Sequence, residues 1–334
     1  MSEYSLSGTS DAYVVDLSAG TAVRAAKIMA QGDSLTVGVV DNGDPVGDPP
    51  SERDGYRLDL FDLILAGGGW IDYVGGGQSG PADMLDPDHN ALNGESLRNM
   101  VRNQDDSPVD LSVGLSTHTP DIVLMMAGTN DYGVSRDIFF SNRFPNLMLN
   151  YQRAIDQFYA YAGSDEKYLV LSTLTPKVSD GIPAEFADFI NEGYSLVDGV
   201  EVPGDEGNGT YVPGLRALVA ANQATHATLI LFDNPVDVTG LSPDLVHFTN
   251  ASYGLYAQEM YNTLLTEIGQ AGGTFAAPSL APPTLRTVSI DLFEGPVGHT
   301  LSLRCGGVAV SRRCGWGERE EKAAAGQGQQ AGEG

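Results

Sequence analysis

A serine near the start of the chain is the first residue that could carry out chemistry. Ser34 stands in Gly32-Asp33-Ser34, directly after the apolar run of residues 25–30. Its hydroxyl is a weak nucleophile at neutral pH, so catalysis would require a base within hydrogen-bond distance and a third group to orient that base. The tripeptide by itself also fits an ordinary turn, because Gly, Asp and Ser are common turn residues. The assignment of Ser34 therefore depends on finding its base.

His247 is the best candidate base among the five histidines. It follows the last apolar run, in a loop that leads into the final helical pattern, and Asp244 precedes it by three residues. An aspartate at this spacing can accept the Nδ1 proton of the imidazole and leave Nε2 free to take a proton from Ser34. A helix-capping histidine beside a turn aspartate explains the segment equally well. His89 has the same spacing from Asp86 and competes as the base, but it falls in a Pro- and Asp-rich crossover loop.

Acyl transfer also requires donors that stabilise the oxyanion of the transition state. Asn130 follows the apolar run 122–127, where a Gly turn would present its amide as a donor. The backbone N–H of Gly94, at the start of a helical pattern, favours a developing anion, and Gly75 is the second choice. The backbone N–H of Ser34 is the third donor. We expect three neighbouring residues to border the substrate: Asp33, Asp131 and Val246.

Strands that alternate with helices must position these residues. Short apolar runs of strand length occur at residues 25–30, 70–74, 122–127, 168–174 and 227–232. Helical patterns lie at residues 56–66, 147–162 and 212–225, and a last helix begins at Thr249 or Asn250. This alternation predicts a parallel sheet covered on both faces, with ligands bound at the carboxyl ends of its strands.

Composition divides the chain into three parts. Residues 1–24 form an N-terminal extension or edge strand, residues 25–272 the catalytic domain, and residues 273–334 a linker and tail. Within the tail, residues 286–303 predict one or two strands, and the charged low-complexity end predicts disorder. The only cysteines, Cys305 and Cys314, form neither a disulfide framework nor a metal pattern.

The charge balance excludes several partners. The chain has 18 Lys and Arg against 44 Asp and Glu, a net charge of −26, which disfavours nucleic acid and anionic lipid surfaces. Such a surface indicates salt tolerance and a marine or halophilic source, although an Asp-rich composition alone explains it equally well. The sequence predicts no membrane span and no signal peptide. It predicts no cofactor and no metal; residues 41–44 and 86–90 offer clustered oxygens for Ca²⁺, but solvated acidic turns explain them better.

Four blocks in chain order resemble those of the SGNH (GDSL-like) hydrolases: residues 32–34, a Gly after the second strand, residues 128–131 and residues 244–247. The resemblance spans about residues 25–270. Within that superfamily, residues 54–57, 71–75 and 88–94 are similar to the family 3 carbohydrate esterases, which remove acetyl groups from xylan. Members of that family usually have Glu-Gly-His-Ser-Gly where this chain has Asn90-Ala91-Leu92-Asn93-Gly94, a departure that bears on substrate identity.

The resemblance implies a flavodoxin-like three-layer α/β/α sandwich with a parallel five-stranded sheet, no metal, and catalytic roles for Ser34, Gly94, Asn130 and His247. The expected reaction is the hydrolysis of short acetyl esters, with an acetylated polysaccharide such as xylan as the substrate. The alternatives are a lysophospholipase- or thioesterase-type hydrolase, and a non-catalytic carbohydrate-binding domain of a larger secreted protein. Because such a polymer does not enter most cells, we expect an extracellular protein.

Overall fold

The computed structural model describes residues 13–16, 21–41, 49–67, 69–102, 107–133, 135–178, 184–198, 200–205, 207 and 210–269, together with the backbone of three strands beyond residue 288. The chain divides into two compact units, residues 1–280 and 281–334. In the second unit, β13 (Ser289–Glu294), β14 (His299–Cys305) and β15 (Val308–Arg313) form an antiparallel sheet. The expected linker before β13 and the expected disordered end, residues 315–334, lie outside the described residues.

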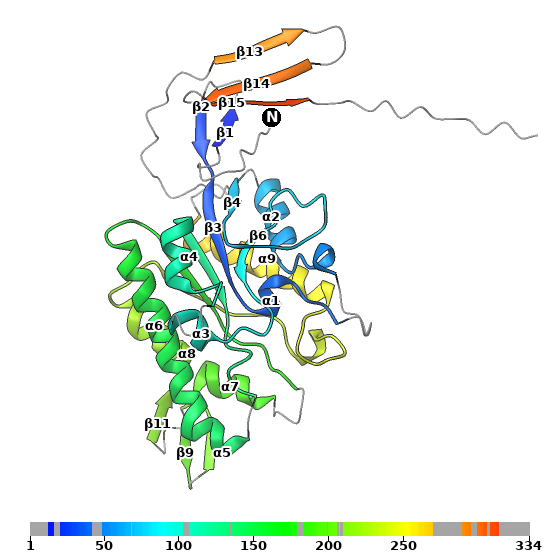
Figure 1. The fold of residues 1–334 in the computed structure, drawn as a ribbon. Coiled ribbons are helices and arrows are strands. Elements are labelled where there is room, and N and C mark those ends of the chain that lie inside the picture. The colour runs from blue at the N-terminus through cyan, green and yellow to red at the C-terminus, as the bar shows by residue number, and fades with distance from the viewer. Residues whose placement is uncertain are drawn as a thin grey trace, which may run out of the picture. The chain divides into compact units, whose positions relative to one another are not determined.

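A mostly parallel sheet forms the centre of the first unit (Figure 1). Its five expected strands are β3 (Ala26–Gly32), β4 (Ile71–Tyr73), β7 (Ile122–Met126), β8 (Tyr168–Ser172) and β12 (Leu229–Phe232). Their spatial order, β4-β3-β7-β8-β12, is the 2-1-3-4-5 order of flavodoxin-like folds. This order confirms the predicted fold class. Two further strands, β6 (Asp88–Ala91) and β5 (Gly77–Gln78), extend the sheet where β4 stops.

Helices cover both faces of this sheet (Figure 1). One face packs against α2 (Arg57–Ala66) and α9 (Asn250–Glu267). The other face packs against α3 (Leu97–Arg102), α4 (Leu111–His118), α6 (Phe144–Ala162), α7 (Glu185–Glu192) and α8 (Leu215–Gln223). Side chains alternate between the two layers: on β7, Leu124 lies in the α2/α9 core and Val123 in the other. The strands β7 and β12 are therefore continuously apolar, as expected for a parallel sheet buried on both faces.

Smaller elements decorate this core. The N-terminal strands β1 (Tyr13–Asp16) and β2 (Thr21–Arg24) form an antiparallel pair with each other. Between α7 and α8, β9 (Gly193–Val197), β10 (Val200–Pro203) and β11 (Thr210–Pro213) form a small antiparallel sheet. Among the described residues, the other short helices are α1 (Ser34–Val37), α5 (Arg136–Ile138), a π-helical turn (Phe139–Arg143) and two 3₁₀ turns (Pro50–Glu52 and Val238–Gly240). Among the described residues, no helix is both long and apolar enough to span a membrane.

Candidate active site

Ser34 begins a short helix immediately after β3. Gly32 ends the strand, and a Cβ there would lie 2.1 Å from the Thr36 hydroxyl oxygen, so only glycine fits this close turn. Asp33 caps α1: its Oδ1 accepts a hydrogen bond from the backbone N–H of Leu35 at 3.0 Å. The Asp33 side chain is completely buried, whereas Ser34 keeps 7% of its surface exposed. The turn thus presents the Ser34 hydroxyl at the carboxyl end of β3.

The structure brings Ser34, His247 and Asp244 together. His247 Nε2 lies 2.8 Å from Ser34 Oγ, and His247 Nδ1 hydrogen-bonds to the Asp244 carboxylate. Asp244 Oδ1 also accepts the backbone N–H groups of Val246 at 2.9 Å and His247 at 3.0 Å. Partial burial would raise the pKa of Asp244, but these hydrogen bonds outweigh it and hold the pKa below its usual value. An ionised Asp244 favours the proton on His247 Nδ1, which leaves Nε2 able to accept one from Ser34.

The loop before α9 holds the imidazole in place through its own backbone. The N–H of Ser242 donates to the carbonyl of His247 at 2.7 Å, and the Ser242 hydroxyl donates to the carbonyl of Phe248 at 2.8 Å. Leu245 adopts a left-handed conformation with φ of +57°, and its N–H donates to the Ser242 carbonyl. This tight turn brings the Asp244 carboxylate back onto the imidazole three residues later.

The expected oxyanion donors come from three neighbouring strand ends. Chain segments leaving β6, β3 and β7 carry Gly94, Ser34 and Asn130, and β3 pairs with the other two strands. Asn130 Nδ2 donates one hydrogen bond to the carbonyl of Glu95 at 3.0 Å, which ties the Asn130 turn to the Gly94 turn. The remaining Nδ2 hydrogen of Asn130 is available to a ligand.

The structure differs from the sequence-based expectation at Gly94 and gives a packing reason for glycine at position 75. Gly94 does not begin a helix: α3 starts at Leu97, and Gly94 lies in the preceding turn with φ of +75°. This left-handed conformation gives a structural reason for glycine, although a Cβ at this position would meet no atom within 4 Å. At Gly75, a Cβ would lie 2.1 Å from the backbone carbonyl of His89, so close packing of chain segments accounts for that glycine.

Of the three expected substrate-bordering residues, Asp131 and Val246 are partly exposed beside Asn130 and His247, whereas Asp33 is completely buried and offers no surface to a substrate. Asp131 follows Asn130, and its Oδ2 accepts the backbone N–H of Leu97 at 2.8 Å. Burial raises the pKa of Asp131 to about 6. Burial also raises the pKa of Asp33, to about 7; the Leu35 N–H opposes this shift and the charge of Asp131 adds to it. Val246 is half-buried between Asp244 and His247.

His89, the competing base, lies elsewhere and has other partners. It is part of β6 rather than of a crossover loop, because β6 continues the sheet beside β3 where β4 ends. Its Nε2 lies 3.1 Å from Ser79 Oγ, and its Nδ1 accepts the backbone N–H of Ala91 at 3.2 Å. Burial lowers the pKa of His89 to about 3. His89 is therefore a neutral, buried histidine that is paired with Ser79.

The segment that departs from the family 3 pattern is partly inside the fold. Asn90 is buried and donates to Gln31 Oε1 at 2.6 Å, so it joins β6 to β3 rather than facing a ligand.

Among the described residues, no group of three or more His, Cys, Asp or Glu side chains is placed to hold a metal ion. The sequence did not predict the contribution of Glu95, whose backbone carbonyl accepts the hydrogen bond from Asn130. Any residue type can supply a backbone carbonyl, so no side-chain pattern could indicate this one.

Comparisons with known proteins show which solved structures have a similar fold. No family model matches the chain, and no curated protein matches its sequence. Among solved structures, it is similar to a family 3 carbohydrate esterase from Clostridium thermocellum, with TM-score 0.50, 19% identity, and coverage of 72% of this chain and 96% of the other. It is also similar to an acetyl esterase mutant with an acetate ion, with TM-score 0.51, 15% identity, and coverage of 72% and 97%. The chain has the SGNH hydrolase fold, as its four sequence blocks predict.

Proposed function

We propose that this protein is a serine esterase of the SGNH type. The observation that carries the proposal is the contact of 2.8 Å between Ser34 Oγ and His247 Nε2, with Asp244 bonded to the opposite ring nitrogen. A serine activated by a histidine that an aspartate orients is the arrangement that acyl transfer requires. Ser34 and His247 are 213 residues apart in the chain, so ordinary local turn chemistry does not account for their contact.

The reaction proceeds in two steps. Ser34 Oγ attacks the ester carbonyl carbon while His247 Nε2 takes its proton, and the tetrahedral oxyanion forms. Collapse of this intermediate breaks the bond to the alcohol, which leaves with the proton from His247 and gives an acyl group on Ser34. Water then attacks the acyl-enzyme, with His247 again accepting and returning a proton, and the acid is released.

Three donors would hold the oxyanion. These are the backbone N–H groups of Ser34 and Gly94 and the side-chain amide of Asn130. Ser34 is the first residue of α1, so its N–H is not used inside that helix. The hydrogen bond from Asn130 to Glu95 fixes the amide before substrate arrives, and such preorganisation is what makes an oxyanion hole effective.

The proposed substrate is a short-chain ester, with acetyl groups on a polysaccharide such as xylan as the leading candidate. The similar structures named above, a family 3 carbohydrate esterase and an acetyl esterase, support this choice. In this proposal residues 25–272 form the catalytic domain, residues 273–334 are an appendage, and the protein acts outside the cell.

The test compares hydrolysis of p-nitrophenyl acetate and p-nitrophenyl octanoate by the wild type, Ser34→Ala and a matched control, Ser79→Ala. Ser79 is as buried as Ser34 and also has a histidine partner, so it controls for removing a buried serine hydroxyl beside an imidazole. We expect acetate-selective turnover that Ser34→Ala abolishes and Ser79→Ala retains. Turnover that survives Ser34→Ala in protein with native circular dichroism would refute the nucleophile assignment. Acetylated xylan is the next substrate.

A further inference from the structure

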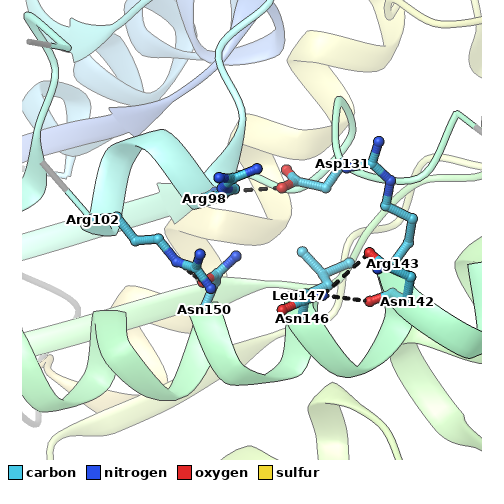
Figure 2. Close-up of a pocket in the computed structure, with 8 residues that line it drawn as sticks. All are labelled: Arg98, Arg102, Asp131, Asn142, Arg143, Asn146, Leu147 and Asn150. Atoms are coloured by element: carbon cyan, nitrogen blue, oxygen red, sulfur yellow. Dashed lines mark hydrogen bonds between the residues drawn. The ribbon is translucent and has the colours of Figure 1, made fainter. Parts of the chain in front are cut away.

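A pocket of about 260 Å³ beside the Asn130 turn concentrates positive charge (Figure 2). Three arginines line it, in a chain whose net charge is −26. Arg98 and Arg102 lie one turn apart on α3, and Arg143 lies across the pocket, at the end of the π-helical turn before α6. Three arginines from two separate parts of the chain thus line the same pocket.

Within the described residues, protein carboxylates only partly balance this charge. Asp131 is the only acidic residue among the eight that line the pocket, and its oxygens accept the backbone N–H groups of Leu97 and Arg98. Across the part of the chain that the structure describes, the ion pairs of arginine involve Arg136 and Arg216, not Arg102 or Arg143. Among the described residues, Arg102 and Arg143 therefore form no ion pair with a carboxylate, and an anionic ligand could pair with them.

One of the polar residues that line the pocket, Asn150, is buried. Asn150 is 1% exposed, and its Oδ1 accepts hydrogen bonds from Arg102 Nε at 3.2 Å and Arg153 Nη1 at 3.0 Å. Desolvation, with the nearby charges of Arg153 and Arg98, lowers the pKa of Arg102. The buried amide thus fixes one guanidinium in an orientation that holds like charges close together.

The other lining residues favour a sugar over a lipid. Asn142 and Asn146 add two more amides, and Leu147 is the only apolar residue among the eight that line the pocket. Amides donate to and accept from hydroxyl groups, whereas an acyl chain requires apolar surface. At about 260 Å³ the pocket is smaller than the sites that hold drug-sized ligands, which suits one sugar ring or one anionic group.

Asp131 joins the pocket to the reaction centre, because it follows Asn130 directly and lines the pocket with its own side chain. We propose that the pocket binds the carboxylate of an acidic sugar, so that the preferred substrate is an acetylated polysaccharide that carries uronic acid residues. This inference rests on the proposed esterase function and names its substrate class. The planar fork of arginine matches a carboxylate in a bidentate pair, and Asn150 holds Arg102 ready for such a pair.

The test measures binding, so that it does not depend on hydrolysis. Isothermal titration uses an acetyl-free xylo-oligosaccharide with one glucuronic acid branch, and the same compound with its carboxyl group reduced to an alcohol. The proteins are Ser34→Ala alone and Ser34→Ala combined with Arg143→Gln, Arg102→Gln or the control Arg216→Gln. Arg216 lies on α8 in ion pairs with Glu192 and Asp233, so Arg216→Gln removes one positive charge outside the pocket.

We expect Ser34→Ala to bind the acidic compound roughly tenfold more tightly than the reduced one, the size of one charge-assisted hydrogen-bond pair. Arg143→Gln and Arg102→Gln should bring this ratio toward one, and Arg216→Gln should keep it. Equal binding of the two compounds to Ser34→Ala, or a ratio that survives both pocket substitutions, would overturn the proposal. So would sulfate or glycerol 3-phosphate binding as tightly as the acidic oligosaccharide, because the pocket would then be an inorganic-anion or lipid-headgroup site.

Failure of the esterase proposal gives a different pattern. If the wild type hydrolyses no ester but the acidic oligosaccharide binds in the expected way, the proposed carboxylate binding at the pocket is retained and the catalytic assignment is wrong. If the wild type hydrolyses p-nitrophenyl acetate through Ser34 but does not discriminate the two oligosaccharides, the esterase stands and the pocket proposal fails.

Discussion

The buried carboxyl group beside Ser34 should make the stability of this protein depend on pH. Asp33 is completely buried, and burial raises its pKa from 3.8 to about 7. Between these two values the folded state keeps a proton that the unfolded state has lost. The free energy of unfolding therefore falls as the pH rises from about 4 to about 7. The shift of roughly three pKa units corresponds to at most about 4 kcal/mol at pH 8.

Asp33→Asn removes this titration and keeps the helix cap, because the amide oxygen of asparagine can accept the Leu35 N–H as Asp33 Oδ1 does. We expect the free energy of unfolding of Asp33→Asn, relative to wild type, to rise by up to about 4 kcal/mol between pH 4 and pH 8. Asp33 Oδ2 has no hydrogen-bond partner, so the Nδ2 group that replaces it in Asp33→Asn would be unpartnered and would destabilise the variant. This cost is the same at every pH, so it cancels when the stability difference at pH 8 is compared with that at pH 4.

Urea unfolding followed by tryptophan fluorescence at pH 4, 5, 6, 7 and 8 measures this difference. Asp237→Asn is the control, because Asp237 also caps a short helical turn but is exposed, and hydrogen bonds from Thr239 lower its pKa. A lowered pKa gives stability that is present at high pH, so this variant should gain nothing between pH 4 and pH 8. A difference for Asp33→Asn that stays flat across the range would refute the reasoning, since Asp33 would then titrate as a solvated carboxyl group.

Four further predictions concern the site. Asp244→Asn should lower kcat for p-nitrophenyl acetate by on the order of 10⁴-fold, because the amide no longer favours the required imidazole tautomer; steady-state kinetics beside circular dichroism checks this. Asn130→Ala should lower kcat by about 10²–10³-fold with an unchanged fold, the size expected for one oxyanion donor. Gly94→Ala should cost roughly 1–3 kcal/mol of stability in urea unfolding, because φ of +75° strains an alanine although its Cβ meets no atom. His89→Gln should leave the pH profile of ester hydrolysis unchanged, because the pKa of His89 is already about 3; a shifted profile would contradict its assignment as a structural residue.

The strands and helices that carry the core could be predicted from the sequence because their apolar patterns are long and uninterrupted. β7 and α9, for example, have nearly their expected bounds. The small sheet of β9, β10 and β11 could not, because its strands are short and mostly polar or half-exposed. The helical pattern expected from Val212 also fails at its start, since Val212 pairs with Tyr194 in that sheet and α8 begins after Gly214.

The strand β6 shows how pairing can override local composition. Residues 86–90 are rich in Asp and Pro, which indicates a loop when read alone. In the structure, β4 pairs with β3 only as far as Tyr73, and this leaves the end of β3 open for Asn90 and Ala91. Similarly, the arginine pocket combines α3 with α6 and the π-helical turn before it, and no local sequence pattern relates α3 to that region. Both features depend on which distant segments contact each other in the fold. Local patterns in a single sequence do not reveal those contacts.

Two local costs in this structure lie beside Ser34 and His247, although similar backbone conformations also occur elsewhere, at Thr119 and Asp198. Asp33 precedes Ser34 with a buried carboxyl group, one of whose oxygens has no hydrogen-bond partner. Leu245 stands between Asp244 and His247 with a left-handed backbone, a conformation that a leucine adopts only at an energetic cost, and its side chain is 42% exposed. Neither feature adds to the core, yet one fixes the helix that presents Ser34 and the other forms the turn that returns Asp244 to the imidazole. Strained conformations persist where the surrounding structure enforces them. Here the two turns hold Ser34 and the Asp244–His247 pair in the arrangement that the proposed mechanism requires.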